Sequence, residues 1–204
     1  MLLGVHVNKK SSVLPNITNE LPIHEAIKRD LDGLDLNSAQ IFTYGPRFPI
    51  ANNINRELVK STCQHIDLTV HSSYISVNVW KVNELNKNVK KYKNYLSHIG
   101  DQLKSCADIG AWGLVLHVVK VPPITVVAVM KLLKPLAITY NIKIILEMVS
   151  NKASDNTYET PQKINYVTQL IGANDRWWGW CVDTAHLWGS GIDNSTYQAF
   201  DKWL

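Results

Sequence analysis

Short apolar runs alternate with longer amphipathic segments along most of the chain. The runs are rich in valine, isoleucine and leucine and have the length of β-strands. They cover residues 2–7, 39–43, 68–71, 113–117, 143–147 and 179–183. Apolar residues recur three and four positions apart in the segments between them, which predicts helices, most clearly over residues 88–109, 124–138 and 164–171. Ser195 is a candidate N-cap for a last helix.

This alternation predicts an α/β fold. Strands separated by helices pair in parallel through crossover connections. The centres of the fourth and fifth runs, residues 114–116 and 144–146, are uninterruptedly apolar, as strands covered on both faces are. The 204 residues hold about six βα units, which we expect to form a single domain, 1–204. An open doubly wound sheet accommodates six units, whereas a closed (β/α)8 barrel needs eight and typically about 250 residues.

Four successive runs end in or beside residues that can bind a metal ion. The third run ends in His71, the fourth in His117, the fifth in Glu147 and the sixth in Asp183, with His186 three residues on. The carboxyl ends of parallel strands form one rim, where active sites are built. A lone histidine or carboxylate at such a place is more often a structural hydrogen-bonding or helix-capping residue, but four in succession are hard to obtain that way. The pattern predicts one metal site, suited to zinc or manganese.

The remaining histidines carry less information. His6 also stands at a strand end, and its sequence context leaves a cleft-lining role open. His24, His65 and His98 fall in helical or loop segments and are expected at the surface.

Composition narrows the class of protein and its compartment. With 46% hydrophobic and 19% charged residues, the chain is neither a disordered tail nor a collagen-like rod nor a coiled coil. We find no apolar run of the roughly 18 residues that a membrane span needs, and no signal peptide, so no membrane partner is expected. Three scattered cysteines (Cys63, Cys106, Cys181) predict an intracellular, reducing location, not secretion. The net charge of +4 allows a polyanionic partner without requiring one.

Several motifs at the strand ends share one register over the whole 204 residues. They are Leu-Gly-Val-His-Val at 3–7, His-Ser-Ser-Tyr at 71–74, Gly-Leu-Val-Leu-His at 113–117, Leu-Glu at 146–147 and Cys-Val-Asp-Thr-Ala-His-Leu-Trp-Gly-Ser-Gly at 181–191. Together they resemble the endonuclease IV family of apurinic/apyrimidinic (AP) endonucleases, and the last motif is close to a family signature. The His-x-x-Tyr block and the Gly-Pro-Arg loop at 45–47 are more similar to virus-encoded members than to bacterial ones.

The resemblance implies a (β/α)8 TIM-barrel type of fold, with about six of eight βα units in this chain. It implies a zinc-dependent phosphoric diester hydrolase of DNA base-excision repair that cleaves double-stranded DNA 5′ to abasic sites. Carried over, His71 and His117 would hold one zinc, the catalytic Glu147 would bridge it to a second, Asp183 would bind the second, and His186 a third.

The resemblance also assigns three residues to DNA. Arg47, Tyr74 and Ile75 match positions from which the family wedges side chains into the duplex at the lesion. Unstacking costs a few kcal/mol and is cheapest at a damaged site, which is itself a source of selectivity. A half-buried structural role for Tyr74 is the alternative.

One departure from the family leaves the activity of this chain open. The family's remaining ligands lie on a seventh and an eighth strand, whereas the sequence ends at Leu204. The chain could be a fragment, the product of a truncated gene, or one that a second chain or C-terminal segment completes. Two other functions also stay open: a metal-dependent sugar isomerase or epimerase of the same barrel superfamily, and a non-catalytic DNA-binding remnant. An endonuclease would act in the cytoplasm or nucleus, or in a virion if viral.

Overall fold

Six parallel strands form one sheet in a computed structural model, which describes residues 3–10, 19–45, 51–150 and 158–204. The strands are β1 (Val5–His6), β2 (Ser38–Phe42), β3 (Asp67–His71), β4 (Gly113–Val118), β5 (Lys143–Met148) and β6 (Trp178–Cys181). They lie side by side in sequence order, β1 to β6. A doubly wound sheet reverses its strand order at a switch point, whereas this order is that of a barrel wall. The TIM-barrel type of fold is confirmed, with six βα units in the described chain.

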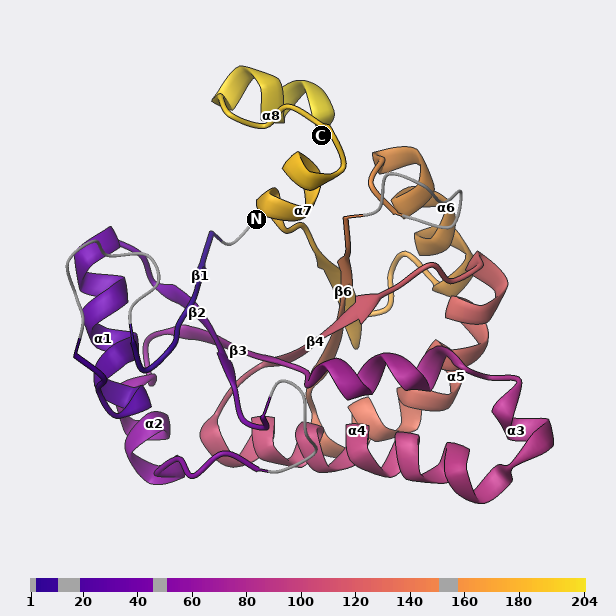
Figure 1. Ribbon diagram of the computed structural model, residues 1–204, viewed down its shortest axis with the longest axis horizontal. Coiled ribbons are helices and arrows are strands. Elements are labelled where there is room, and N and C mark those ends of the chain that lie inside the picture. Colours follow the sequence, from indigo (N-terminus) through magenta and orange to yellow (C-terminus); the bar gives the residue numbers. More distant parts are fainter. Residues whose placement is uncertain (1–2, 11–18, 46–50, 151–157) are drawn as a thin grey trace.

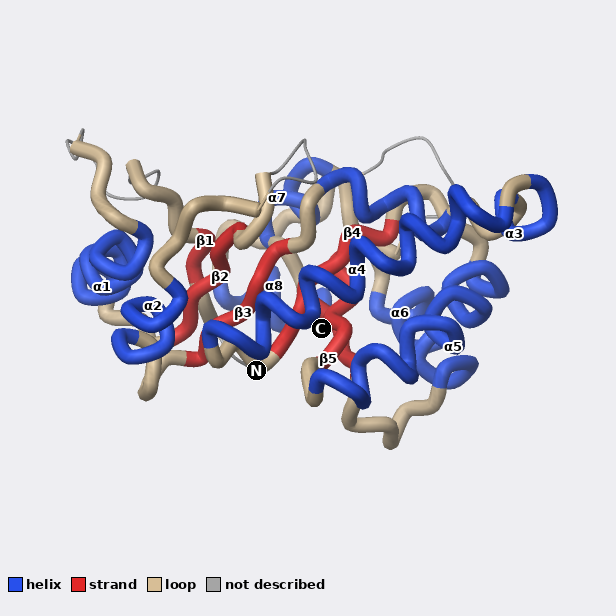
Figure 2. The backbone as a smooth tube through the Cα atoms, turned by 90° about the horizontal axis from the view of Figure 1, so that it is seen from below, coloured by secondary structure: helices blue, strands red, loops and turns tan. Residues whose placement is uncertain are grey.

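The helices that lie between strands in the sequence connect them, and α1, α4, α5 and α6 lie outside the wall that the strands form, whereas α7 and α8 follow β6 (Figures 1 and 2). They are α1 (Ile23–Leu34), α2 (Arg56–Thr62), the 3₁₀ helix η1 (Tyr74–Trp80), α3 (Glu84–Lys87), α4 (Val89–Ile109), α5 (Pro123–Tyr140), α6 (Pro161–Ile171), α7 (Thr184–Gly189) and α8 (Tyr197–Trp203). The three helices that the sequence predicts most clearly are α4, α5 and α6. The last helix begins later than predicted: Thr196 is its N-cap and accepts a hydrogen bond from the Ala199 amide, whereas Ser195 donates to Asp193.

Strand residues alternate between the outer helices and the inside of the wall. On β4 and β5 the outward residues, Leu114, Leu116, Ile144 and Leu146, are fully buried under the helices. The intervening residues, such as Val115 and Ile145, line the inner cavity. Both faces of these strands are therefore apolar over most of their length, which explains the uninterrupted runs in the sequence.

The wall is open between β1 and β6, because each of these strands pairs on one side only among the described residues (Figure 1). A cavity of about 500 Å³ lies inside. Val5, Val115 and Ile145 contribute apolar lining, and Glu147 and Asp183 contribute carboxylates. The opening thus leads to the predicted metal site.

Helix α5 is longer and more apolar than the sequence analysis allowed. By length and composition alone it could cross a membrane, and it carries only Lys131 and Lys134 as charged residues. It is the crossover between β4 and β5, and one third of its residues (33%), including Met130 and Leu133, are buried in the protein core. Core helices of globular proteins commonly have this character, so the finding is weak support for a membrane span.

Candidate metal centre

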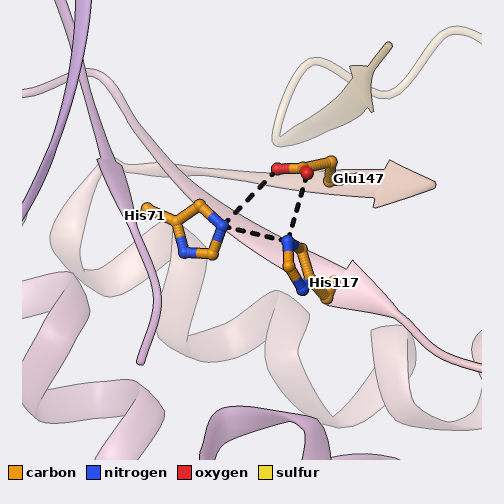
Figure 3. Close-up of side chains that lie close together, drawn as sticks. All are labelled: His71, His117 and Glu147. Atoms are coloured by element: carbon orange, nitrogen blue, oxygen red, sulfur yellow. Dashed lines mark hydrogen bonds and ion pairs between the residues drawn. The ribbon is translucent and has the colours of Figure 1, made fainter. Parts of the chain in front are cut away.

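Strand register sets the first group of candidate ligands on the inner face of the wall. His117 on β4 pairs directly with Glu147 on β5. His71, the last residue of β3, pairs with Val115, which lies two residues before His117 and therefore on the same face. The three side chains converge from neighbouring strands (Figure 3).

Their donor atoms are close enough to share one ion. The Nε2 atoms of His71 and His117 are 3.0 Å apart, and Glu147 places Oε1 3.1 Å from His117 Nε2 and Oε2 3.7 Å from His71 Nε2. Zinc binds histidine nitrogen at about 2.0–2.1 Å, which puts two tetrahedral ligands roughly 3.3 Å apart. Two nitrogens and a carboxylate at these separations fit a divalent cation of the zinc class.

Backbone contacts orient this group. His71 Nδ1 lies 2.6 Å from the Ser72 carbonyl oxygen, so an Nδ1–H donated there leaves the Nε2 lone pair facing the centre. The Trp80 indole N–H donates to the carbonyl of His117 at 2.7 Å. The bond of His71 Nδ1 is the kind of outer hydrogen bond that sets the tautomer and ring orientation of metal-binding histidines, whereas the Trp80 bond holds the backbone of His117.

A second group shares Glu147 with the first. Glu147, Asp183 and His186 bring one donor atom each within 4.8 Å of one another. His186 Nδ1 lies 3.2 Å from Glu147 Oε1, 3.8 Å from Asp183 Oδ2 and 2.7 Å from the Met148 carbonyl oxygen. Glu147 thus belongs to both candidate groups, and its Oε1 meets both His117 Nε2 and His186 Nδ1.

Asp183 lies beyond the strand that the sequence assigned to it. Strand β6 ends at Cys181, and Asp183 is the N-cap of α7, accepting the His186 amide hydrogen at 2.9 Å through Oδ1. The helix-capping alternative is therefore correct for one carboxylate oxygen. The other oxygen, Oδ2, remains on the side of His186 Nδ1.

The ionisation states of Glu147 and His71 favour the binding of a cation. Burial would raise the pKa of Glu147, but hydrogen bonds and positive charge from the surrounding histidines lower that pKa to about 2. Burial lowers the pKa of His71 to about 4, against the attraction of Glu147. The hydrogen bond to Glu147 raises the pKa of His186, against burial. At neutral pH the centre therefore offers an ionised carboxylate and a neutral His71, the forms that metals bind.

His6 lies at the same centre. It lines the cavity with Glu147 and Asp183, and its ring centroid is 5.7 Å from that of His71. Its Nδ1 lies 2.9 Å from Gln40 Oε1, and burial lowers its pKa. His6 therefore lines the cleft, the role that its sequence context left open.

Two of the three predicted DNA-contacting residues lie beside the centre. Tyr74 is 46% exposed, its ring stacks on that of His117 with centroids 5.6 Å apart, and it stands edge-on to His71. Ile75 follows it in η1 and is half-buried. Arg47 lies outside the described residues.

The prediction that His98 lies at the surface is wrong. It is half-buried on α4, and its Nε2 lies 2.7 Å from Ser73 Oγ. The signal in the sequence was its position next to the buried residue Ile99, with Gln102 one turn later on the same buried side of the helix.

Fold and site together define a protein of the TIM-barrel type with a candidate histidine–carboxylate metal centre at the carboxyl ends of its strands. No family model matches the chain. Among its relatives is a probable AP endonuclease of African swine fever virus (isolate Tick/South Africa/Pretoriuskop Pr4/1996), 30% identical over 194 residues, which cover 92% of this chain and 61% of the relative. Another is a probable endonuclease 4 of Mycoplasma mycoides subsp. mycoides, 28% identical over 221 residues, covering 99% and 69%.

Solved structures agree with these relatives. The crystal structure of AsfvAP:AG superposes with a TM-score of 0.75 and 25% identity, covering 99% of this chain and 67% of that one. Endonuclease IV from Thermus thermophilus gives a TM-score of 0.65 at 16% identity, covering 98% and 70%. D-Psicose 3-epimerase from Clostridium cellulolyticum gives 0.64 at 15%, covering 100% and 71%. At 16% and 15% identity, these last two structures show a shared fold alone.

The resemblance to the endonuclease IV family is therefore confirmed, and a probable AP endonuclease encoded by a virus is among the relatives. The chain spans about three fifths of the length of the viral relatives that it matches.

Proposed function

We propose that this chain carries the metal centre and part of the DNA-binding surface of an AP endonuclease, which hydrolyses the phosphodiester bond 5′ to an abasic site in double-stranded DNA. The observation that carries the proposal is the pair of ligand groups that share Glu147 on the rim of the wall. The AP endonuclease relatives extend over nearly the whole chain and support the same substrate class.

Zinc is the proposed metal. His71, His117 and Glu147 would hold one ion, and Glu147, Asp183 and His186 offer donors for further ions. When bound, zinc would neutralise charge on the phosphate and lower the pKa of a water molecule. Manganese, which prefers oxygen ligands, suits the nitrogen-rich first group less well.

The chain's own residues would hold and orient the substrate. Glu147 is ionised and buried, so it keeps the histidine nitrogens turned toward the centre. Tyr74 presents nearly half of its surface to solvent next to His117, with Ile75 adjacent, where an aromatic and an apolar group could enter a gap in a base stack. We assign lesion selectivity to this pair and to Arg47.

We further propose that additional βα units, from a continuation of the chain or from a second chain, close the wall between β1 and β6. Unpaired strand edges and a cavity of about 500 Å³ call for such a cover, and the viral relatives are longer than this chain. The closed barrel would be one domain acting on DNA inside the cell.

Two substitutions test the function. Tyr74→Ala should lower the ratio of affinities for abasic and intact duplexes while leaving the zinc content unchanged. Tyr166→Ala is the matched control, because Tyr166 is 58% exposed on the outer helix α6. Loss of zinc in Tyr74→Ala, with an unchanged affinity ratio, would show that Tyr74 is structural.

Glu147→Gln should abolish nicking of an abasic duplex but retain duplex binding. If Glu147→Gln nicked the duplex at the wild-type rate, the metal centre would have no part in the reaction. A sugar epimerase, the alternative with the same fold, would turn over a free ketose and show no preference for abasic DNA.

A further inference from the structure

We propose that His98 is a positioning residue that fixes the segment bearing His71 and Tyr74 against the segment that follows β2. This inference rests on the proposed function, because it gives those segments the task of reading DNA. His98 touches neither ligand group and would act through Ser73 and Tyr44.

The first contact is with Ser73, which lies between His71 and Tyr74 and is fully buried. Its hydroxyl is 2.7 Å from His98 Nε2, and its amide N–H donates to Gln102 Oε1 at 2.8 Å. Gln102, also fully buried, donates from Nε2 to Ser76 Oγ at 2.8 Å. Residues of helix α4 are thus hydrogen-bonded to both ends of the first turn of η1, at Ser73 and at Ser76.

The second contact is with Tyr44. The rings of His98 and Tyr44 meet edge to face, with centroids 5.5 Å apart and planes at 89°. Tyr44 follows β2 and forms an isolated antiparallel bridge with Ala51. In the sequence Arg47 comes three residues after Tyr44. One imidazole therefore joins two segments that come from different strands.

The chemistry makes this junction stiff. The buried Ser73 hydroxyl meets His98 Nε2 at 2.7 Å and Ser76 Oγ at 3.3 Å, so loss of His98 would leave it only the longer contact, which lies within η1, and would cost free energy. Tyr74 is the next residue, and its ring stacks on His117. A displacement of about 1 Å in a substrate-positioning group can cost about 100-fold in rate. Movement of Ser73 would shift the aromatic ring relative to the centre without removing any ligand.

Three substitutions separate the two contacts. His98→Gln keeps a hydrogen-bonding group near the position of Nε2, since its amide can donate or accept, but loses the ring that meets Tyr44. His98→Phe keeps the ring and loses the hydrogen bond to Ser73, and His98→Ala loses both. His65→Ala is the matched control, because His65 is exposed and precedes β3 at its other end.

The experiment measures amide hydrogen exchange over residues 72–80, zinc content, and the affinity ratio for abasic over intact duplex. We expect His98→Ala to speed exchange at 72–76 and to lower the affinity ratio about tenfold, with zinc content unchanged. We expect His98→Gln to restore protection at 72–76 and His98→Phe not to restore it.

Wild-type exchange and a wild-type ratio in His98→Ala would overturn the proposal, as would a loss of zinc equal to the loss of discrimination. If His98→Ala does not fold, the contrast between the Gln and Phe variants decides, and equal exchange in those two would overturn the hydrogen-bond role. A wild-type chain that binds abasic and intact duplexes equally would refute the proposed function, while the exchange measurement would still decide whether His98 orders the segment.

Discussion

Glu147→Gln should weaken both ligand groups at once, because Glu147 alone belongs to both. Glutamine has nearly the shape of glutamate but lacks its charge, so the packing around a side chain that is 3% exposed is preserved. The pKa of Glu147, lowered from 4.5 to about 2, means that the folded protein favours the ionised form by on the order of 3 kcal/mol. Glutamine resembles the neutral acid, so the metal-free variant should lose a large part of that free energy of unfolding.

The effect on metal binding should be larger than that of an outer-shell substitution, which typically costs about 10–100-fold in affinity. The assay is calorimetric titration of chelator-stripped protein with zinc. Asp183→Asn is the matched control: asparagine caps a helix as well as aspartate does, so α7 is kept, and only the second group loses one of its two carboxylates. We expect Asp183→Asn to retain zinc binding by the first group and Glu147→Gln to weaken zinc binding by both groups. Wild-type affinity in Glu147→Gln, or a loss confined to one group, would refute the sharing of this carboxylate.

Two further predictions concern the wall and its acid stability. In Gly113→Ala the new Cβ would meet Cδ1 and Cγ1 of Ile145, a side chain whose end borders the inner cavity and can turn into it, so urea unfolding should show a loss of less than about 1 kcal/mol. A loss of about 1–3 kcal/mol that Ile145→Val reduces would show that Ile145 cannot move aside. Because the pKa of His71 falls from 6.5 to about 4 on folding, the unfolded chain binds the extra proton between these values, and the metal-free protein should lose stability as the pH falls from 6.5 to 4. Urea midpoints measured with chelator should depend less on pH in His71→Gln, and an equal slope in that variant would contradict the assignment.

The sequence was sufficient to predict that the residues of the first group lie close together, because their placement follows from strand periodicity. Parallel strands that end together place alternate residues on one face, so His71, His117 and Glu147 had to approach one another once the strands paired in order. Strand order itself is a tertiary property, and for this reason six βα units could not distinguish an open doubly wound sheet from a barrel wall. The order β1 to β6 decides that question.

The remaining parts of the site depend on contacts distant in sequence. The place of Asp183 depends on where β6 ends, at Cys181, and where α7 begins, at Thr184. The continuous motif at 181–191 gives no sign of this boundary. His98 was assigned to the surface because helical spacing shows which face is apolar but not which loop covers its edge. Its bond to Ser73 arises from the packing of α4 on η1, 25 residues away in the chain.

The most direct test of the proposed function is a nicking assay on a duplex that carries one synthetic abasic site, with added zinc and with chelator. We expect zinc-dependent incision on the 5′ side of the lesion, none with chelator, and none in Glu147→Gln. Incision that survives both chelator and Glu147→Gln would contradict the proposed role of the metal centre. An abasic duplex left intact by the folded, zinc-loaded chain, both alone and with the rest of the swine fever virus relative supplied as a second polypeptide, would contradict the proposed function itself.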